Sequence, residues 1–171
     1  MQMNDSFALQ EDIVDLIPRL RRFAFGLTGN STDADDVVQI ALERSLTRLH
    51  QYKPGTRLDS WMFRIVQNCW FNECRRNQRT ETGMDMTDLE RLPNAPVADH
   101  SQRHDQLRDI THAMSHLNDD QRSLVMTVLV EGHSYKDAAD LFEIPIGTVM
   151  SRLTRARKTL MAILSDDGAE E

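Results

Sequence analysis

The apolar residues of this chain recur every three or four positions in two blocks, and an aperiodic polar stretch separates the blocks. This spacing gathers apolar side chains on one face of an α-helix, whereas a half-buried strand needs strict alternation. No part of the chain competes with a strand pattern. We therefore predict an all-α protein with two small helical domains joined by a flexible linker.

Three helices are predicted in the first block. An apolar stripe runs from Ile13 to Leu27 and stops at Gly29-Asn30. The second helix runs to about His50, and its start resembles a capping box of Thr32 and Asp35. After the turn at Pro54-Gly55, a third helix extends from Ser60 to about Gln78. The three helices of the first block are expected to pack through their apolar residues, which are Leu16, Ile17, Leu20, Phe23, Ala24, Val37, Ile40, Ala41, Leu49, Met62, Ile65, Val66 and Cys69.

The second block starts with an apolar stripe in residues 107–117. Asn118 and Gln121 have the spacing of a capping box, which predicts a helix through Val130 that Gly132 ends.

Another capping box, Ser134 with Asp137, opens a short helix that breaks at residues 143–145. A long helix follows. These lengths fit a helix-turn-helix, whose second helix lies in the major groove of DNA. Spacing alone leaves a helical hairpin with a solvated basic face equally open. The inner stripe of the long helix is expected to be Val149, Leu153, Ala156, Leu160 and Leu164.

The formal net charge of −7 at first disfavours nucleic acid, because Lys and Arg drive phosphate binding. The distribution of charge argues otherwise. Residues 10–79 carry 11 basic and 9 acidic groups, residues 80–104 carry 2 and 5, and residues 166–171 carry 0 and 4. Residues 144–165 hold four basic groups and no acid, so one local basic helix survives the acidic total.

The aperiodic stretch, residues 80–104, contains Gly83, Pro93 and Pro96 and is predicted to be a flexible linker. The predicted domains are listed with the connecting segments: an N-terminal extension 1–9, a first domain 10–79, the linker 80–104, a second domain 105–165 and an acidic tail 166–171.

Several classes of protein are disfavoured. No window reaches the roughly 18 apolar residues of a membrane span, and the N-terminus lacks a secretory pattern, so we predict a cytoplasmic chain without membrane insertion. Cys69 and Cys74 lack the spacing of most zinc or redox pairs and are predicted to be thiols. The histidine pairs, His100 with His104 and His112 with His116, have no evident third ligand. We predict no cofactor and no metal.

Three stretches of the chain resemble the extracytoplasmic-function sigma factors of bacterial RNA polymerase. LNDDQRSLVMTVLVEGHSYKDAADLFEIPIGTVMSRLTRARKTL resembles their region 4, DADDVVQIALERSLTRL their region 2.2, and DSWMFRIVQNCWFNECRR their regions 2.3 and 2.4. Met150 stands where a lysine is frequent, and Glu143 where the turn usually has glycine. The resemblance implies a sigma factor that directs core RNA polymerase to promoter DNA, responds to a stress or signal and is controlled by an anti-sigma factor.

The resemblance also implies roles for particular residues. Those implied to contact the minus-thirty-five element, and expected to face outward, are Thr148, Ser151, Arg152 and Arg155. Those sharing one face of the third helix, suited to the minus-ten element, are Arg64, Asn68, Asn72, Arg75 and Arg79. Those implied to dock on the polymerase clamp are Asp35, Asp36, Gln39 and Glu43. Stacking surfaces could come from Trp61, Trp70 and Phe71, of which at least two are expected in the core.

Three alternatives remain at this point. A sigma-like decoy could bind a regulator without reading DNA, but it would not need the basic helix. A stand-alone helix-turn-helix repressor would leave the implied polymerase-docking helix unexplained. An enzyme is disfavoured, because the sequence offers no nucleophile with a plausible base, no phosphate loop and no metal cluster.

Overall fold

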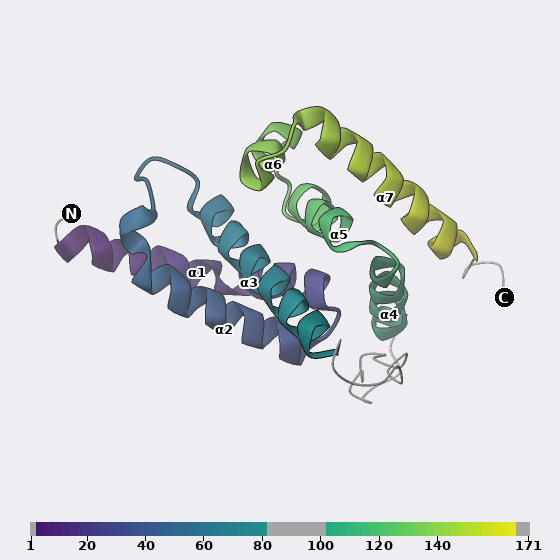
Figure 1. Ribbon diagram of the computed structural model, residues 1–171, viewed down its shortest axis with the longest axis horizontal. Coiled ribbons are helices and arrows are strands. Elements are labelled where there is room, and N and C mark those ends of the chain that lie inside the picture. Colours follow the sequence, from purple (N-terminus) through teal and green to yellow (C-terminus); the bar gives the residue numbers. More distant parts are fainter. Residues whose placement is uncertain (1–2, 82–101, 167–171) are drawn as a thin grey trace. The chain divides into compact units, whose positions relative to one another are not determined.

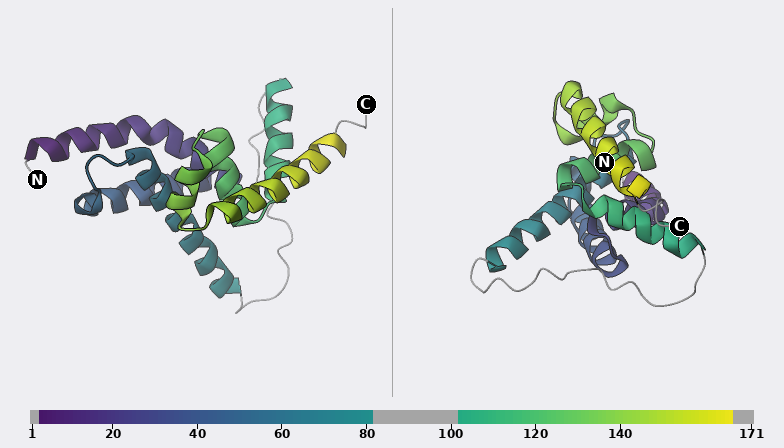
Figure 2. Two further views of the ribbon diagram at one scale, coloured as in Figure 1. Left: turned by 90° about the horizontal axis from the view of Figure 1, so that it is seen from above. Right: turned by 90° about the vertical axis from the view of Figure 1, so that its right-hand side faces the viewer.

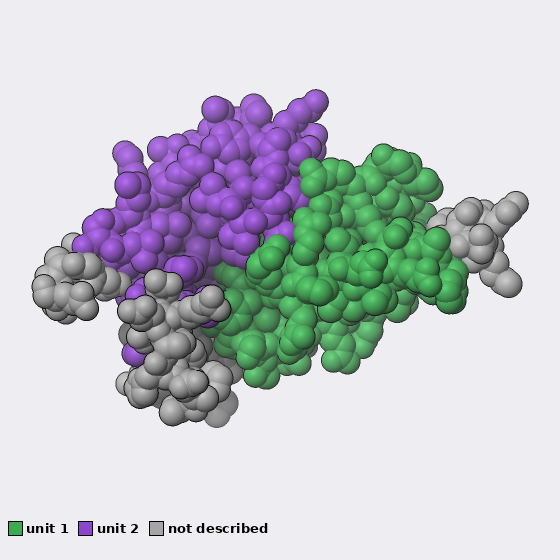
Figure 3. All heavy atoms as spheres, turned by 180° about the vertical axis from the view of Figure 1, so that it is seen from behind, with its two compact units in different colours: residues 1–92 green, residues 93–171 purple. Residues whose placement is uncertain are grey.

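The computed structural model describes residues 3–81 and 102–166, with side chains from 7 to 76 and from 107 to 165. Every regular element in these ranges is helical, as predicted (Figure 1). The chain divides into two compact units, Met1–Leu92 and Pro93–Glu171 (Figure 3). Most of the predicted linker lies outside the described residues, and the predicted domain limits stay predictions.

The first unit is built from three long helices. They are α1 (Met3–Thr28), α2 (Ser31–Thr47) and α3 (Leu58–Glu81), with a short 3₁₀ helix, Leu49–Gln51, after α2. Each long helix packs against the other two. The predicted second helix is therefore shorter than expected, since its last turn tightens into the 3₁₀ helix.

An aromatic pair lies in the core of the first unit. The rings of Phe23 and Phe63 have centroids 4.7 Å apart at an interplanar angle of 34°, and both side chains are completely buried. Burying one such side chain contributes about 1.5–3 kcal/mol. The apolar spacing predicted Phe23 but missed Phe63. The predicted core residues that prove only half-buried are Leu16, Ile17, Ile40 and Ile65.

The predicted capping box of Thr32 and Asp35 is wrong. Asn30 caps α2 instead: its Oδ1 accepts from the Asp33 backbone N–H at 2.8 Å, and its Nδ2 donates to Asp33 Oδ2 at 2.6 Å. Gly29, at φ 80°, ends α1 so tightly that the next residue is already the cap. Asn is also a better cap than Thr.

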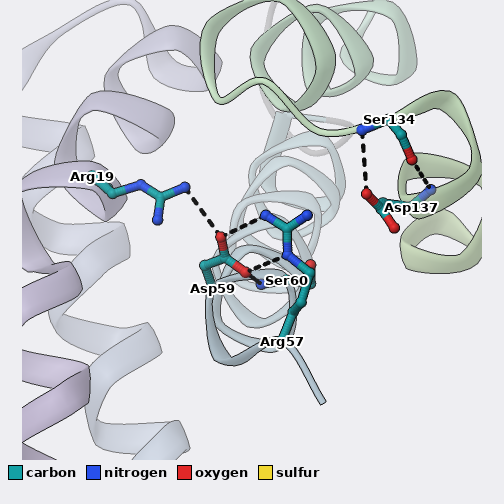
Figure 4. Close-up of polar contacts among 6 residues, drawn as sticks. All are labelled: Arg19, Arg57, Asp59, Ser60, Ser134 and Asp137. Atoms are coloured by element: carbon teal, nitrogen blue, oxygen red, sulfur yellow. Dashed lines mark hydrogen bonds and ion pairs between the residues drawn. The ribbon is translucent and has the colours of Figure 1, made fainter. Parts of the chain in front are cut away.

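The start of α3 is held by the carboxylate of Asp59, whose side chain is 13% exposed. Its Oδ2 accepts from Arg19 of α1 at 3.2 Å and from Arg57 at 2.9 Å, while its Oδ1 accepts from the Ser60 backbone N–H at 2.7 Å (Figure 4). A carboxylate is also favourable at the positive end of a helix dipole. This cluster joins α1 to the loop before α3.

The second unit consists of α4 (Gln102–Ser115), α5 (Asp119–Val125), α6 (Tyr135–Phe142) and α7 (Ile146–Asp166). The continuous helix α7 packs against the other three (Figure 2). The helix predicted to reach Val130 is α-helical only to Val125, because Met126–Val130 forms a π-helical turn.

Both capping boxes predicted in the second unit are confirmed. Asn118 Oδ1 accepts from the Gln121 backbone N–H at 2.9 Å, and Gln121 Oε1 accepts from the Asn118 N–H at 3.2 Å. Ser134 and Asp137 make the same reciprocal pair at 3.0 and 3.3 Å (Figure 4). Each box satisfies backbone donors that the first turn of a helix leaves unpaired.

The turn between α6 and α7 contains a strained residue. Glu143 adopts φ 54° and ψ 42°, the left-handed conformation that usually favours glycine. A residue with a Cβ pays about 1–2 kcal/mol there. The turn nevertheless closes as in a helix-turn-helix, and its inner stripe is buried at Val149, Leu153 and Ala156. The predicted stripe fails at its end, since Leu164 is 44% exposed.

We predict that Asp59→Ala lowers the free energy of unfolding of the first unit by about 1–3 kcal/mol, because it removes charge-assisted hydrogen bonds to a mostly buried carboxylate. Asp35→Ala is the matched control. It removes an exposed ion pair to Arg21 and should cost about 0.2–1 kcal/mol. Tryptophan fluorescence during urea unfolding reports this unit alone, since both tryptophans, Trp61 and Trp70, lie on α3. Equal losses in the two variants would contradict the role given to Asp59.

Candidate nucleic-acid interface

The exposed face of α7 holds four basic side chains, and the structure separates them into two kinds. Arg155 and Lys158 are exposed, and neither side chain makes an ion pair or hydrogen bond with a described residue. Arg152 pairs with Asp120 of α5 at 2.9 Å, and its side chain is 33% exposed. Arg157 Nη2 donates to the Tyr135 hydroxyl at 3.3 Å. Arg155 is thus the predicted reader whose guanidinium is available to a ligand.

The two hydroxyl residues of the predicted reading face lie at the start of α7. Thr148 is half-buried and Ser151 is exposed. The Ser151 hydroxyl donates to the Thr148 carbonyl oxygen at 3.1 Å. Its lone pairs can still accept, so Ser151 is better placed to accept a hydrogen bond than to donate one.

The contact between Asp120 and Arg152 was missed in the sequence. The two residues lie on different helices, so no local spacing connects them. The only available sign was an acidic pair, Asp119-Asp120, in the first turn of a helix, where capping and dipole effects already account for acids.

A polar face on α3 is brought together as predicted. Asn68, Asn72 and Arg75 are exposed, and Arg64, one turn before Asn68, is half-buried. Their separations of three and four residues keep them on one side of the helix. Arg79 lies on α3, but its side chain is outside the described side chains.

The three aromatic residues of α3 are all half-buried, although at least two were expected in the core. Trp61 packs on Tyr52, with ring centroids 5.6 Å apart at 55°. The Tyr52 hydroxyl donates to the Thr56 carbonyl oxygen at 2.7 Å, so this ring pair also braces the turn before α3. Of the indole nitrogens, that of Trp70 is buried, so Trp61 and Phe71 are the better candidates for contact with a ligand.

The predicted polar face of α2 is only partly assembled. Asp36, Gln39 and Glu43 are exposed at separations of three and four residues, and Gln39 Nε2 donates to Glu43 Oε1 at 3.4 Å. Asp35 is also exposed, but its two oxygens accept from Arg21 of α1 at 2.7 and 2.8 Å. Asp35 therefore belongs to the contact between α1 and α2, and the other three carry the open face.

The cysteines and the predicted histidine pairs are the remaining residues to place. Cys69 and Cys74 form no disulfide, and burial raises the pKa of the Cys69 thiol, partly offset by nearby Arg44. His116 Nδ1 lies 3.0 Å from the His112 carbonyl oxygen. The other histidine pair lies outside the described side chains. Within the described residues, no three potential metal ligands come together.

The described residues form a helical protein with a helix-turn-helix in one unit and a polar helical face in the other. Family models for sigma-70 region 2 and sigma-70 region 4 match residues 13–80 and 107–160. The chain is also 36% identical over 171 residues to the ECF RNA polymerase sigma factor EcfG of Rhodopseudomonas palustris (strain TIE-1), covering all of this chain and 92% of that protein. The chain belongs to the sigma-70 family, among its extracytoplasmic-function sigma factors.

Solved structures share the fold. The sigma factor RpoE from Bartonella quintana, in complex with the anti-sigma factor NepR, matches with a TM-score of 0.80 and 28% identity, over 94% of this chain and 97% of that one. The anti-anti-sigma factor PhyR of the same organism matches with a TM-score of 0.58 and 16% identity, over 86% of this chain and 47% of that one. The second match concerns the fold alone. Within the described residues, none of the helices combines the length and the apolar composition that a membrane span requires.

Proposed function

We propose that this sigma factor binds core RNA polymerase, directs it to promoters through two DNA-contacting faces and starts transcription in the cytoplasm. The observation that carries this proposal is α7, which presents Arg155 and Lys158 to solvent and has no acidic residue between Ile146 and Ser165. Although the whole chain is acidic, this one basic helix can bind the phosphate backbone of DNA. The protein would contribute recognition and no catalysis of its own.

The upstream promoter element is assigned to α7. Arg155 would donate to a base edge or a phosphate, and Thr148 and Ser151 would add short contacts at the start of the helix. Arg152 needs a different account from the one its sequence position suggests. Its pair with Asp120 must be exchanged for DNA, so its net contribution should be smaller than that of Arg155.

The minus-ten element is assigned to the polar face of α3. The amides of Asn68 and Asn72 can donate to and accept from the edges of unpaired bases, while Arg75 and Arg64 can hold phosphates. Arg79 would extend this face. Half-buried Trp61 or Phe71 could stack on a base, which is worth about 1–3 kcal/mol per base.

Docking on the polymerase is assigned to Asp36, Gln39 and Glu43 on α2. Tethering both units to one large partner raises the effective concentration of each DNA-contacting face, so two weak contacts select a promoter together. We further propose control by an anti-sigma factor in response to a stress or signal, supported by the similarity to a sigma factor solved with NepR.

The sigma-like decoy is the second candidate, because an anti-anti-sigma factor has the same fold. The fold therefore does not choose between the two. A decoy has no need of a cationic reading helix, and this feature favours the sigma factor. A stand-alone repressor leaves the polar face of α3 and the open face of α2 without a role.

Run-off transcription with core polymerase from the source organism tests the proposed function. We predict promoter-dependent transcripts with the wild-type chain and a loss of at least about tenfold with Asp36→Arg combined with Gln39→Ala, because charge reversal in a docking face typically costs more than about 1.4 kcal/mol. Asp12→Arg, at an exposed position of α1, is the control and should transcribe normally. Absence of any transcript from a promoter library with the wild-type chain would favour the decoy.

We predict that Arg155→Ala weakens binding of the upstream element by about 1–3 kcal/mol if Arg155 contacts a base. If Arg155 contacts a phosphate instead, the slope of log binding constant against log salt concentration should fall by about 1. Arg152→Ala should cost less, because Arg152 has to give up its ion pair with Asp120 before it can meet DNA. Fluorescence anisotropy of holoenzyme on labelled duplex measures both. Arg108→Ala, exposed on α4, serves as the control. Unchanged binding by both α7 variants would remove the reading face from α7.

We predict that Asn68→Ala and Arg75→Ala slow strand opening more than they weaken the first duplex complex, because their groups suit unpaired bases. Permanganate footprinting follows the opened thymines, and anisotropy at low temperature follows the closed complex. Glu11→Ala, exposed on α1, is the control. Opening at the wild-type rate in both variants would contradict the assignment of this face.

A further inference from the structure

The exposed face of α7 carries an apolar stripe beside its cations. Ile146 is 48% exposed and Met150 is 51% exposed, and Thr154, one turn further on, is exposed as well. Separations of four residues place the three on one side of the helix. Ser151 and Arg155 form the neighbouring row, each one position after Met150 and Thr154. Apolar side chains thus lie within the face that would meet DNA.

Hydrogen bonds inside the helix leave little donor capacity in this stripe. The Thr154 hydroxyl donates to the Met150 carbonyl oxygen at 2.8 Å, so Thr154 can offer a ligand its methyl group and a hydrogen-bond acceptor but no donor. The Ser151 hydroxyl is used in the same way, toward Thr148. A base edge that only offers acceptors would find few donors here apart from Arg155.

The charge around the stripe selects the kind of partner. Arg155 and Lys158 are exposed nearby, and the sequence holds no acid between Ile146 and Ser165. A purely apolar protein partner would have to desolvate these cations, at a cost that only paired charges recover. DNA supplies phosphates for the cations, and its major groove also offers an apolar group, the C5 methyl of thymine.

We propose that Met150, with the methyl group of Thr154 beside it, packs against a thymine methyl in the major groove and thereby selects an A·T pair in the upstream element. This inference rests on the proposed function. The flexible, polarisable methionine side chain suits such a contact, because it adapts to an irregular apolar surface. Met150 is then a specificity-determining residue, where the lysine frequent in similar sequences would add a phosphate contact without base preference.

Deoxyuridine tests the contact directly, because it differs from thymidine by the C5 methyl alone. The probe is the tightest-binding duplex that full-length protein with core polymerase recovers from a library randomised over the upstream element. Each thymine of either strand is replaced by deoxyuridine in turn, and binding is measured by anisotropy. At one or two neighbouring positions, we expect replacement of thymine by deoxyuridine to weaken binding of the wild-type holoenzyme about fourfold. This factor corresponds to the loss of one buried methyl group.

Two substitutions of Met150 test whether this residue is responsible for the preference for thymine. Met150→Ala should bind thymine and deoxyuridine duplexes equally, because the partner of the methyl group is gone. Met150→Lys should also lose the preference and should bind with a steeper salt dependence, by about one phosphate contact. Met161→Ala makes the same substitution at another exposed position of α7 and should keep the wild-type preference.

The outcomes separate the inference from the function beneath it. Equal binding of all thymine and deoxyuridine duplexes by wild-type holoenzyme, a recovered element without thymine on either strand, or a methyl preference retained in Met150→Ala would each overturn the contact while leaving the sigma factor in place. A holoenzyme that recovers no duplex at all would overturn the proposed function, and the inference with it.

Discussion

The burial of one face of α7 determines which residues of this helix are exposed to a partner. Val149, Leu153 and Ala156 are buried against the rest of the second unit. An α-helix has 3.6 residues per turn, so the rows through Met150 and Ser151 face outward when these three positions are in the core. The reading surface is therefore a consequence of packing. A core substitution that rotated α7 about its axis would change which residues are exposed, although no residue of the exposed face itself had been replaced.

Internal pairing then decides how much of the surface charge is available. Asp35 is taken up by Arg21, Asp120 by Arg152, and Asp59 by two arginines. The two exposed pairs, Asp35 with Arg21 and Asp120 with Arg152, add little stability, about 0–1 kcal/mol each, whereas the mostly buried carboxylate of Asp59 contributes more. The larger effect of the exposed pairs is on the surface, since a paired arginine meets a phosphate only after giving up its carboxylate. Arg155 and Arg152 are neighbours in sequence and look alike there, yet the structure gives them different starting states.

The sequence predicted what depends on local spacing. Helical periodicity identified the two units, and the capping boxes at Asn118 and Ser134 were correct, because a cap involves residues only three apart. The box at Thr32 failed where two capping residues competed and the tight end of α1 favoured Asn30. The Phe23–Phe63 and Asp120–Arg152 contacts join different helices, so no local spacing could reveal which residues pair. Among the candidate site residues, helical spacing placed Asn68, Asn72 and Arg75 on one exposed side of α3, but it could not show that Asp35 and Arg152 were already paired.

The turn at Glu143 shows how such a surface tolerates a local cost. Its left-handed backbone costs about 1–2 kcal/mol relative to glycine, yet the turn must close there for α6 and α7 to pack. Packing energy offsets that strain, because Val149, Leu153 and Ala156 of α7 are buried. Selectivity works by similar small terms. A single methyl contact distinguishes bases only about fourfold, but contributions from separate positions are roughly additive, so one such contact multiplies with the base contacts of Arg155 and the second DNA-contacting face. A helix that exchanges a lysine for Met150 gives up some affinity shared by all sequences and gains a preference among them.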